Sequence, residues 1–351
     1  MPALLAWAAA RRPAGHVKVV HAVVTEAFAG TERYVADVAT EQARQGLEVT
    51  VIGGQPLRDR LPRTVTWLPG GTLVLALRAA WALGRQDIAH AHLTYGETVL
   101  TATRSRHHGA RLATRHLATP RGRSMTGRLA RTLIERRLQT ELAISQFVSN
   151  ATSGGTIRVL HNGVPAAPLS LSREARTVVM AHRLEPEKRT EVGLQVWFAS
   201  GLAERGFYLL VAGEGSERLR LEALVAAHPQ AASITFTGWI DDMPGLWRKA
   251  AVLLAPAEAE PLGLSVLEGM AHGIPVVASA AGGHLESLAG FPACLFPGDD
   301  PGAGGQLLAG LADADVRAKV GAALQQAQQD RFSLDGHVRQ LTEVYRSLAD
   351  S

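Results

Sequence analysis

The stretch AEAEPLGLSVLEGMAHGIPVVASAAGGHLE, residues 257–286, brings acidic groups, helix-start signals and glycine turns closer together than any other part of the chain. Its apolar residues recur at helical spacing, which predicts a helix that begins near Gly263. Gly273 and Pro275 end this helix, since glycine followed by proline is usual after a helix C-terminus. Residues 274–278 then read as a short buried strand. The stretch is therefore predicted as loop, helix, turn, strand and loop.

Two carboxylates and two glycines in this stretch indicate a ligand crevice. Glu260 precedes the free backbone N–H groups of the helix start, which attract an anion such as a phosphate. Glu268 lies inside the helix, within reach of a neutral polar group such as a sugar hydroxyl. Gly282 and Gly283 form a pliable loop after the strand, at the edge where open α/β sheets bind ligands. The alternative interpretation is a buried helix that carries an incidental pair of glutamates.

Length and composition limit the class of protein. A chain of 351 residues with 46% hydrophobic and 19% charged residues is typical of a globular protein with two domains. No apolar run approaches the roughly 18 residues of a membrane span. Cys294 is the only cysteine, which excludes a disulfide framework or a thiolate metal site and favours a reducing cytoplasm. The first 15 residues carry their positive charges after the apolar ones, unlike a secretory signal, and are interpreted as a tail.

The chain opens with the alternation of a parallel sheet. Residues 17–24 read as a strand, residues 31–45 as a helix and residues 48–53 as a second strand. The loop between the first strand and the helix contains Gly30, followed by Thr31 at an expected N-cap position. This loop is a second candidate anion site.

Histidines follow or occupy two further predicted strands. Residues 87–93 read as a strand that carries His90 and His92 on one face. Paired histidines suggest a metal, but without a third ligand at a suggestive spacing they are interpreted as core or pocket histidines. The next strand, residues 111–116, ends in His116, at the edge of the sheet where ligands gather. His116 is therefore the polar candidate of this half of the chain.

An arginine-rich segment extends from Arg104 to Arg137, where ten arginines face a single acid, Glu135. It lacks the interleaved aromatic residues expected for binding single-stranded nucleic acid. A solvated basic face near an anionic acceptor or membrane surface is favoured, and a basic face without any ligand is the alternative. Arg121 and Arg123 are the candidate acceptor-side residues of this segment, together with Thr31.

A second series of alternating elements follows a proline- and serine-containing linker at residues 164–172. The expected strands are residues 177–181, 207–212, 233–237 and 252–255, and the expected helices are residues 190–205, 216–228, 243–250, 307–328 and 336–348. Arg183 and Lys188 lie in the loop after the first of these strands, where they would meet a diphosphate bound at the Gly263 helix start. Gly213 and Gly215 form a weaker phosphate signal. A surface salt-bridge loop is the alternative for the two cations.

With these residues in view, the chain resembles a family 4 glycosyltransferase, a retaining enzyme of two-domain GT-B architecture that uses nucleotide sugars. The segment EPLGLSVLE contains the family's two glutamates, separated by seven residues, at Glu260 and Glu268. It continues into a GGxxE motif that ends at Glu286. Arg183 and Lys188 in RLEPEK match the arginine and lysine that hold the donor diphosphate in the family.

The resemblance spans nearly the whole chain. AFAGTERYVADVATEQARQGLEVTVIG is similar to the family's first loop and helix, DIAHAHL to its inter-domain strand and HNGV to its linker turn. It implies an α/β fold of the GT-B type, with two Rossmann-like parallel-sheet domains that face each other across a cleft. Residues 16–165 would bind the acceptor and residues 173–330 the donor. Residues 331–351 would form a helix, with Tyr345, that crosses back to the first domain.

The resemblance also implies roles for individual residues. His116 would contact the donor sugar, and Gly30 would lie by the donor phosphates. Glu260 would bind the sugar hydroxyls and Glu268 the ribose. The expected catalytic residues are Glu260, His116, Arg183 and Lys188, and the expected donor-binding residues are Gly30, Gly213, Gly215, Trp239, Ile240, Pro261, Leu262, Gly263, Leu264 and Glu268.

Two departures from the family pattern concern loop shape. Ala29 stands where a second glycine is usual in the first loop, and His182 stands where a glycine usually precedes Arg183. These changes are expected to alter the shape of the loops and the entry of the acceptor rather than to abolish donor binding.

The expected function is retaining transfer of a sugar from a UDP- or GDP-linked donor to a hydroxyl of a glycan, lipid or natural product. No metal or other cofactor is expected, because the adjacent acids Asp241 and Asp242 lie on a different turn from the donor loops. A cytoplasmic protein with peripheral contact to an anionic membrane, and no nucleic-acid partner, fits this composition. The alternatives are a nucleotide-sugar isomerase or phosphorylase of the same fold, and a non-enzymatic protein that binds anionic surfaces.

Overall fold

The computed structural model describes residues 17–107, 109–118, 134, 136–152, 157–169, 172 and 174–349. Two of the expected acceptor-side residues, Arg121 and Arg123, lie outside these described residues, as does half of the arginine-rich segment from 104 to 137. Among the helices of the described part, none is both long and apolar enough to cross a membrane.

The described chain divides into two compact units with one parallel sheet of seven strands and one of six. The first unit contains the chain up to Ala113, residues 132–139 and the chain from Val344. The second unit contains residues 114–131 and the chain from Thr140 to Glu343. The parallel sheets confirm the predicted α/β class. The domain limits expected at residues 165, 173 and 330 remain predictions.

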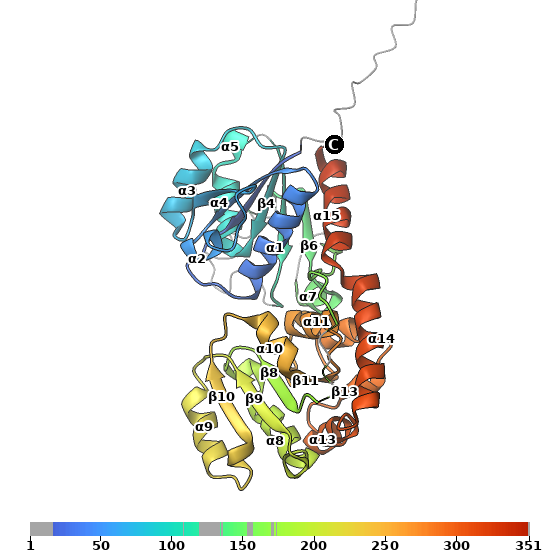
Figure 1. The fold of residues 1–351 in the computed structure, drawn as a ribbon. Coiled ribbons are helices and arrows are strands. Elements are labelled where there is room, and N and C mark those ends of the chain that lie inside the picture. The colour runs from blue at the N-terminus through green and yellow to red at the C-terminus, as the bar shows by residue number, and fades with distance from the viewer. Residues whose placement is uncertain are drawn as a thin grey trace, which may run out of the picture. The chain divides into compact units, whose positions relative to one another are not determined.

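The seven-stranded sheet has the order β3-β2-β1-β4-β5-β6-β7 (Figure 1). Its elements are β1 (Lys18–Val23), α1 (Gly30–Arg44), β2 (Glu48–Gly53), α2 (Gln55–Arg58), β3 (Thr66–Pro69), α3 (Leu73–Ala82), β4 (Ile88–His92), α4 (Leu93–Ala102), α5 (Arg104–His107), β5 (Ala110–Arg115), β6 (Thr140–Ala143), α7 (Gln146–Ala151) and β7 (Ile157–Val159). The strands expected from the sequence are present. Strand β3 and helices α2, α3, α4 and α7 were not predicted. Helix α3 is apolar along most of its length and therefore lacks a polar face that would mark it as a surface helix.

Strand β1 lies inside this sheet and pairs with β2 on one side and with β4 on the other. Its residues from Val19 to Val23 are fully buried, as expected for a strand of a parallel sheet that helices cover on both faces. The register of the β1–β4 pair sets His21 opposite His90, and Val23 opposite His92.

The six-stranded sheet has the order β10-β9-β8-β11-β12-β13 (Figure 1). Its elements and the helices that follow are β8 (Thr177–Ala181), the 3-10 turn Pro186–Lys188, α8 (Thr190–Ser200), β9 (Tyr208–Ala212), α9 (Arg218–Ala226), β10 (Ile234–Gly238), α10 (Met243–Lys249), β11 (Ala250–Ala255), α11 (Leu264–Ala271), β12 (Val276–Ser279), α12 (His284–Ser287), β13 (Leu295–Phe296), α13 (Pro301–Gly310), α14 (Ala314–Phe332) and α15 (Leu334–Ala349).

Strand β11 is the centre of this second sheet. All six of its residues are buried, and it pairs in parallel with β8 and β12. Trp197 of α8 and Trp247 of α10 are fully buried in the cores on either side of the sheet. Burying a large side chain stabilises the fold by about 1.5–3 kcal/mol, so these two tryptophans fix the helices against the sheet that carries the loops described below.

The single helix expected over residues 307–328 is wrong. The structure has two helices there, α13 and α14, separated by a turn. The side chain of Asp313 accepts hydrogen bonds from the backbone N–H groups of Asp315 and Val316 at 2.8 and 3.0 Å, which caps the start of α14. The apolar spacing continues through the turn, and therefore the periodicity alone did not reveal the break.

Candidate functional site

The candidate site of the second unit lies at the carboxyl ends of β8, β9 and β11, three neighbouring strands of the six-stranded sheet. The loop after β8 carries Arg183 and Lys188, the loop after β9 carries Gly213 and Gly215, and the loop after β11 carries Glu260. Parallel strands bring their carboxyl ends to the same edge of a sheet, which is where ligands bind in open α/β folds.

An ion pair joins the loops after β8 and β11. The Lys188 Nζ lies 2.6 Å from Glu260 Oε2, and the two side chains are only 16% and 17% exposed. Burial by itself raises the pKa of Glu260, but the charge and hydrogen bond of Lys188 outweigh it, so this pKa lies below its usual value. Glu260 is therefore a carboxylate near pH 7, available to accept hydrogen bonds from hydroxyl groups. The structure thus brings these two expected site residues into contact, and their roles toward a ligand remain predictions.

The other basic residues of the β8 loop differ in their partners. Arg183 contacts Glu187 at 2.8 Å, with both side chains about half exposed. Such a surface pair contributes little, about 0–1 kcal/mol, so Arg183 can leave Glu187 for an anion at low cost. Arg189, which was not predicted, forms an ion pair with Glu258 from the loop after β11. Its backbone is left-handed, with φ 51°, which is unusual for a residue other than glycine.

The glycines after β9 are required because the backbone of the β8 loop passes directly over them. Gly213 has φ +146°, and a Cβ atom there would lie 1.9 Å from the carbonyl oxygen of His182. A Cβ atom at Gly215 would lie 2.2 Å from the carbonyl oxygen of Leu184. The backbone N–H of Leu184 donates to the carbonyl of Glu214 at 2.8 Å. The two loops are thus held together by backbone contacts that no side chain would permit.

Helix α11 begins as expected. Its N-cap is Gly263, whose φ of 92° is open only to glycine at low cost, and the helix runs from Leu264 to Ala271. Leu262 is buried, and Pro261 accepts a hydrogen bond from the Ser145 hydroxyl at 2.5 Å. The first N–H groups of such a helix attract anions. The predicted loop-helix-turn-strand order of this stretch is confirmed.

Glu268 lies in α11, half-buried, and accepts a hydrogen bond from Trp247 Nε1 at 3.3 Å. Trp239 follows β10 and is 52% exposed, with its Nε1 donating to Asp241 Oδ1 at 3.1 Å. An exposed indole next to a glycine turn offers a flat surface for a base or a sugar. Ile240 is half-buried beside it. The ligand roles expected for these residues remain predictions.

Glu286 is a structural anchor that the motif contained but to which no role was assigned. Its carboxylate accepts hydrogen bonds from the backbone N–H groups of Gln146 and Phe147, at 2.7 and 2.8 Å, at the start of α7. It also contacts His161 Nε2 at 2.9 Å. A carboxylate at a helix N-terminus is favourable because it meets unpaired N–H groups and the positive end of the helix dipole. The GGxxE glutamate therefore ties α7 to α12.

His116 directly follows β5 and is buried. Burial, together with the nearby charges of His337 and Arg115, lowers the pKa of His116 to about 3. His337 is buried as well, with Nδ1 2.7 Å from the carbonyl oxygen of His161, and burial lowers its pKa to about 4. Both imidazoles are neutral near pH 7. His116 is thus suited to hydrogen bonding and not to carrying a positive charge.

The lowered pKa values of His116 and His337 predict that the folded protein loses stability in acid. Below pH 6.5 the unfolded chain binds protons at both histidines before the folded chain does, so the free energy of unfolding falls as the pH decreases from about 6.5 to about 4. The slope is at most about 1.4 kcal/mol per pH unit for each histidine. Urea denaturation of the wild type and of His337→Gln at several pH values measures this. The variant should lose less stability, and parallel curves would contradict the prediction.

The second candidate anion site, the loop before α1, is only partly as predicted. Helix α1 begins at Gly30, so Thr31 lies inside the first turn, and the expectation that it is the N-cap is wrong. The N-cap residue is Ala29, whose side chain cannot accept a hydrogen bond. Glu32 compensates by reaching back to the Ala29 N–H at 2.8 Å. Because Ala29 has no side-chain oxygen, the sequence pattern favoured the threonine two residues later. Gly30 is exposed in the first unit, and its predicted role remains a prediction.

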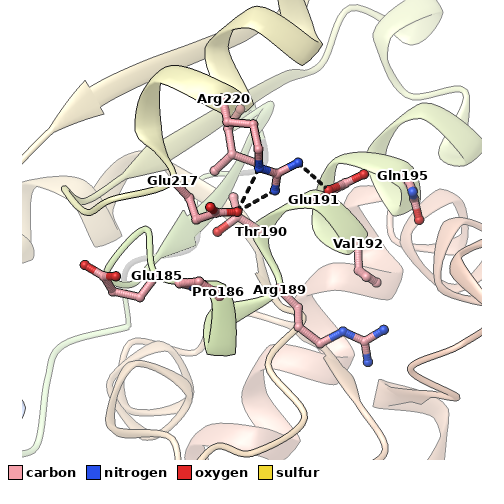
Figure 2. A pocket seen from close by; sticks show the side chains of 10 residues that line it. Glu185, Pro186, Arg189, Thr190, Glu191, Val192, Gln195, Glu217 and Arg220 are labelled. Carbon is pink, nitrogen blue, oxygen red and sulfur yellow. Dashed lines mark hydrogen bonds and ion pairs between the residues drawn. The ribbon is translucent and has the colours of Figure 1, made fainter.

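A cavity of about 380 Å³ adjoins the β8 loop and was not predicted (Figure 2). It is lined by residues 185, 186 and 189 of the loop and by side chains of α8 and α9. Arg220 reaches between Glu191 and Glu217, with contacts of 2.7 and 2.5 Å (Figure 2). Its ten lining residues include none of the predicted donor residues. The charges that line it come from three different elements, which is why no local motif revealed it.

Part of the second unit, which carries the β8, β9 and β11 loops, matches a known protein family. Residues 175–313 match the family described as Glycosyl transferases group 1. This segment is a group 1 glycosyl transferase domain. The match includes the β8, β9 and β11 loops described above, and it confirms the resemblance to family 4 glycosyltransferases that the sequence motifs indicated.

Curated relatives of this glycosyl transferase domain match over part of their length. The D-inositol 3-phosphate glycosyltransferase of Corynebacterium urealyticum is 31% identical over 206 residues, 55% of this chain and 48% of the relative. The 2-deoxystreptamine glucosyltransferase of Streptomyces kanamyceticus is 36% identical over 108 residues, 30% of this chain and 28% of the relative. The chain thus spans about half or less of the length of these two relatives.

Solved structures confirm that the glycosyl transferase domain is part of a GT-B fold. Anabaena HepE, in a complex with UDP and glucose, has a TM-score of 0.76 at 21% identity, covering 95% of this chain and 100% of HepE. The sucrose-phosphate synthase of Thermosynechococcus elongatus has a TM-score of 0.75 at 20% identity, covering 96% of this chain and 100% of the synthase. The predicted fold class is confirmed.

Proposed function

We propose that the protein is a retaining glycosyltransferase that moves a sugar from a nucleotide-diphosphate sugar, UDP- or GDP-linked, to a hydroxyl of a glycan, lipid or natural product. The observation that carries the proposal is the Lys188–Glu260 ion pair beside the start of α11. It joins a cation suited to a diphosphate with a carboxylate suited to sugar hydroxyls. The named activities of the partial relatives and the UDP and glucose of HepE support this choice.

The chemistry follows from the charge that the reaction develops. When the anomeric bond breaks, negative charge grows on the β-phosphate of the leaving nucleoside diphosphate. Lys188, Arg183 and the N–H groups at the start of α11 stabilise that charge. Glu260 holds the sugar hydroxyls so that the anomeric carbon faces the acceptor, and Glu268 binds the ribose. The acceptor hydroxyl attacks from the side of the leaving phosphate, which takes up its proton, and the anomeric configuration is retained.

Binding of a donor would change the hydrogen bonds of Lys188 and Glu260. With no diphosphate present, Glu260 neutralises Lys188 at 2.6 Å. A diphosphate brings additional negative charge, so Lys188 turns part of its hydrogen bonding to the phosphate, and Glu260 gains acceptor capacity for hydroxyl groups. The Arg189–Glu258 pair continues to hold the two loops together while this exchange takes place. Lys188 and Glu260 therefore act as one unit toward the donor.

The donor and the reaction are tested together. Thermal-shift measurements with UDP-, GDP-, ADP- and dTDP-sugars identify the donor, because a ligand that binds the folded chain raises its melting temperature by mass action. A UDP- or GDP-sugar is expected to give the largest shift. The transfer reaction is then followed with this donor, and NMR coupling constants of the product should show the retained anomeric configuration. An inverted product, or epimerised donor without transfer, would contradict the proposal.

We also propose that the protein acts in the cytoplasm, with peripheral contact to an anionic membrane surface.

We further propose that catalysis needs no divalent metal at the donor site. Two cations and a helix start meet the phosphate charge that a metal would otherwise neutralise. Transfer measured immediately after addition of excess EDTA should proceed at an unchanged rate. Loss of activity on this time scale, with recovery on adding Mg²⁺ or Mn²⁺, would show that the metal is required.

A further inference from the structure

Three buried histidines form a cluster inside the first unit, whereas the Lys188–Glu260 pair belongs to the second unit. His21 of β1 stands opposite His90 of β4 in the parallel register, and His92 lies two residues further along β4. All three side chains are fully buried, and one ring nitrogen of each lies within 4.8 Å of the others. The sequence showed only the pair on β4. The third histidine is 69 residues away from His90, since 90 minus 21 is 69, and only the strand pairing brings it there.

The outer nitrogens of two of these histidines are already held by neighbouring groups. The Nε2 of His21 lies 2.7 Å from Gln42 Oε1 of α1, and the Nδ1 of His90 lies 2.7 Å from the hydroxyl of Tyr345 of α15. Gln42 Nε2 donates to the same hydroxyl at 3.3 Å. Metal-binding histidines almost always have their other ring nitrogen fixed by such a partner, which orients the ring and sets its tautomer.

The hydrogen bonds leave an inward-facing lone pair on His21. Because Gln42 presents its carbonyl oxygen, the proton of His21 resides on Nε2, and Nδ1 is the acceptor. This Nδ1 faces the Nε2 of His92 at 3.0 Å. A metal ligand must offer such a lone pair on an unprotonated ring nitrogen, and this hydrogen-bond pattern provides it. The protein thus holds three imidazole nitrogens close together among buried side chains of the first unit.

We propose that His21, His90 and His92 form a structural binding site for a divalent transition metal, with Zn²⁺ as the expected ion. Imidazole nitrogens select zinc and its neighbours over Mg²⁺ and Ca²⁺, which prefer oxygen ligands. Zinc–nitrogen bonds of about 2.0–2.1 Å in tetrahedral geometry separate ligand atoms by about 3.3 Å, so the three rings need only a modest inward shift. A water molecule that enters with the ion would complete the tetrahedron as the fourth ligand. On binding, the proton of His92 moves from Nε2 to Nδ1 of the same ring, so that His21 and His92 both bind the metal as neutral imidazoles.

A metal here would link four elements, the strands β1 and β4 and the helices α1 and α15. Its ligands come from the neighbouring strands β1 and β4, and their outer nitrogens are fixed by Gln42 of α1 and by Tyr345 near the end of α15. The free energy of metal binding would therefore stabilise the docking of α1 and of the C-terminal segment on the sheet. This role does not rest on the proposed transfer reaction, whose Lys188–Glu260 pair lies in the second unit.

The test uses the full-length chain, purified without a histidine tag from medium supplemented with Zn²⁺ or Co²⁺, because a site closed to solvent loads most readily during folding. After desalting, mass spectrometry of the metal content should give about one equivalent per chain. The cobalt form should show the intense visible bands of a tetrahedral nitrogen site. A metal-free protein from both media, or a cobalt spectrum typical of an octahedral aquo ion, would overturn the proposal.

Two variants connect the metal to this cluster. Tyr345→Phe keeps the buried ring but removes the hydroxyl that fixes His90, and it should weaken metal retention about 10–100-fold in competition with a chelator. His228→Gln, at a partly exposed histidine of the second unit, is the matched control and should retain the wild-type amount. His92→Asn should abolish binding. If Tyr345→Phe and a folded His92→Asn both retained the full equivalent, the assignment to these histidines would be wrong.

Discussion

Replacing Glu260 by alanine is expected to lower kcat/KM for sugar transfer by about 100-fold or more. The expected loss is large because Glu260 holds the sugar hydroxyls, and a misplacement of about 1 Å at a reacting centre can already cost about 100-fold in rate. Its carboxylate is enclosed, 17% exposed, with Lys188 at 2.6 Å. The change removes both the acceptor for the hydroxyls and the charge that orients Lys188. Steady-state kinetics with the donor identified by thermal shift measure the effect.

Two further variants show which property of Glu260 matters. Glu260→Gln keeps the shape and one acceptor oxygen but removes the charge, so it should recover part of the activity lost in Glu260→Ala. Glu222→Ala is the matched control, because Glu222 is also an ion-paired glutamate, 2.8 Å from Arg218, but lies on helix α9 with 37% of its side chain exposed. It should leave transfer unchanged. Equal activity in Glu260→Ala and Glu222→Ala would exclude the proposed role.

Stability must be measured on the same variants. Alanine at position 260 leaves the Lys188 ammonium in a largely enclosed site without its carboxylate, which costs roughly 1–3 kcal/mol. A lower melting temperature alone would therefore be expected and would not explain a loss of turnover in the folded protein. If the remaining folded Glu260→Ala protein bound the donor with unchanged affinity and turned it over at the wild-type rate, the carboxylate would have only a structural function.

The helices and strands that have a clear local sequence pattern could be predicted, and those without such a pattern could not. Strands such as β2 and β8 were predicted with the bounds that the structure has, because short apolar runs between turn residues are strong signals for buried parallel strands. Strand β3 was missed, since its four residues, TWLP, include a proline and no alternation. The boundary between α13 and α14 was missed because the cap at Asp313 lies inside a continuous apolar spacing.

The residues of the candidate site that lie in local motifs were predicted, and those that only the fold brings together were not. Glu260, Gly263 and the loop with Lys188 were predicted because each lies in a local motif, and the contact between Lys188 and Glu260 follows from the carboxyl ends of neighbouring strands. His21 was not recognised as a partner of His90, since strand register between β1 and β4 is not readable from either strand alone. The Arg189–Glu258 ion pair was missed for the same reason, because its two residues lie 69 positions apart, 258 minus 189.

The glycine at position 213 is expected to be the most sensitive backbone position of the candidate site. Gly213→Ala should reduce the free energy of unfolding by about 3 kcal/mol or more, which corresponds to roughly 6–12 °C in melting temperature for a unit of this size. Two causes add: φ is +146°, and the new Cβ would lie 1.9 Å from the carbonyl oxygen of His182. This collision can be avoided only if the loops after β8 and β9 move apart.

Two other glycines isolate these causes. Gly206 has φ +73°, and a Cβ atom there meets nothing within 4 Å, so Gly206→Ala measures the cost of the left-handed backbone alone, about 1–2 kcal/mol. Gly215 is not left-handed, but its Cβ would lie 2.2 Å from the carbonyl oxygen of Leu184, so Gly215→Ala measures the backbone collision. If Gly213→Ala were no more destabilising than Gly206→Ala, the β8 and β9 loops would not be in the close contact described here.

The same three variants also test the donor site. Separation of the two loops moves Arg183 and Lys188, which follow His182 on the β8 loop, relative to Glu260. Donor affinity should therefore fall in Gly213→Ala and Gly215→Ala and stay unchanged in Gly206→Ala, which lies before β9 and away from the carboxyl ends of the strands. A loss of affinity in all three variants in proportion to their stability would mean that the loops merely support the fold. A loss confined to positions 213 and 215 would connect the glycine contacts to the position of the cations.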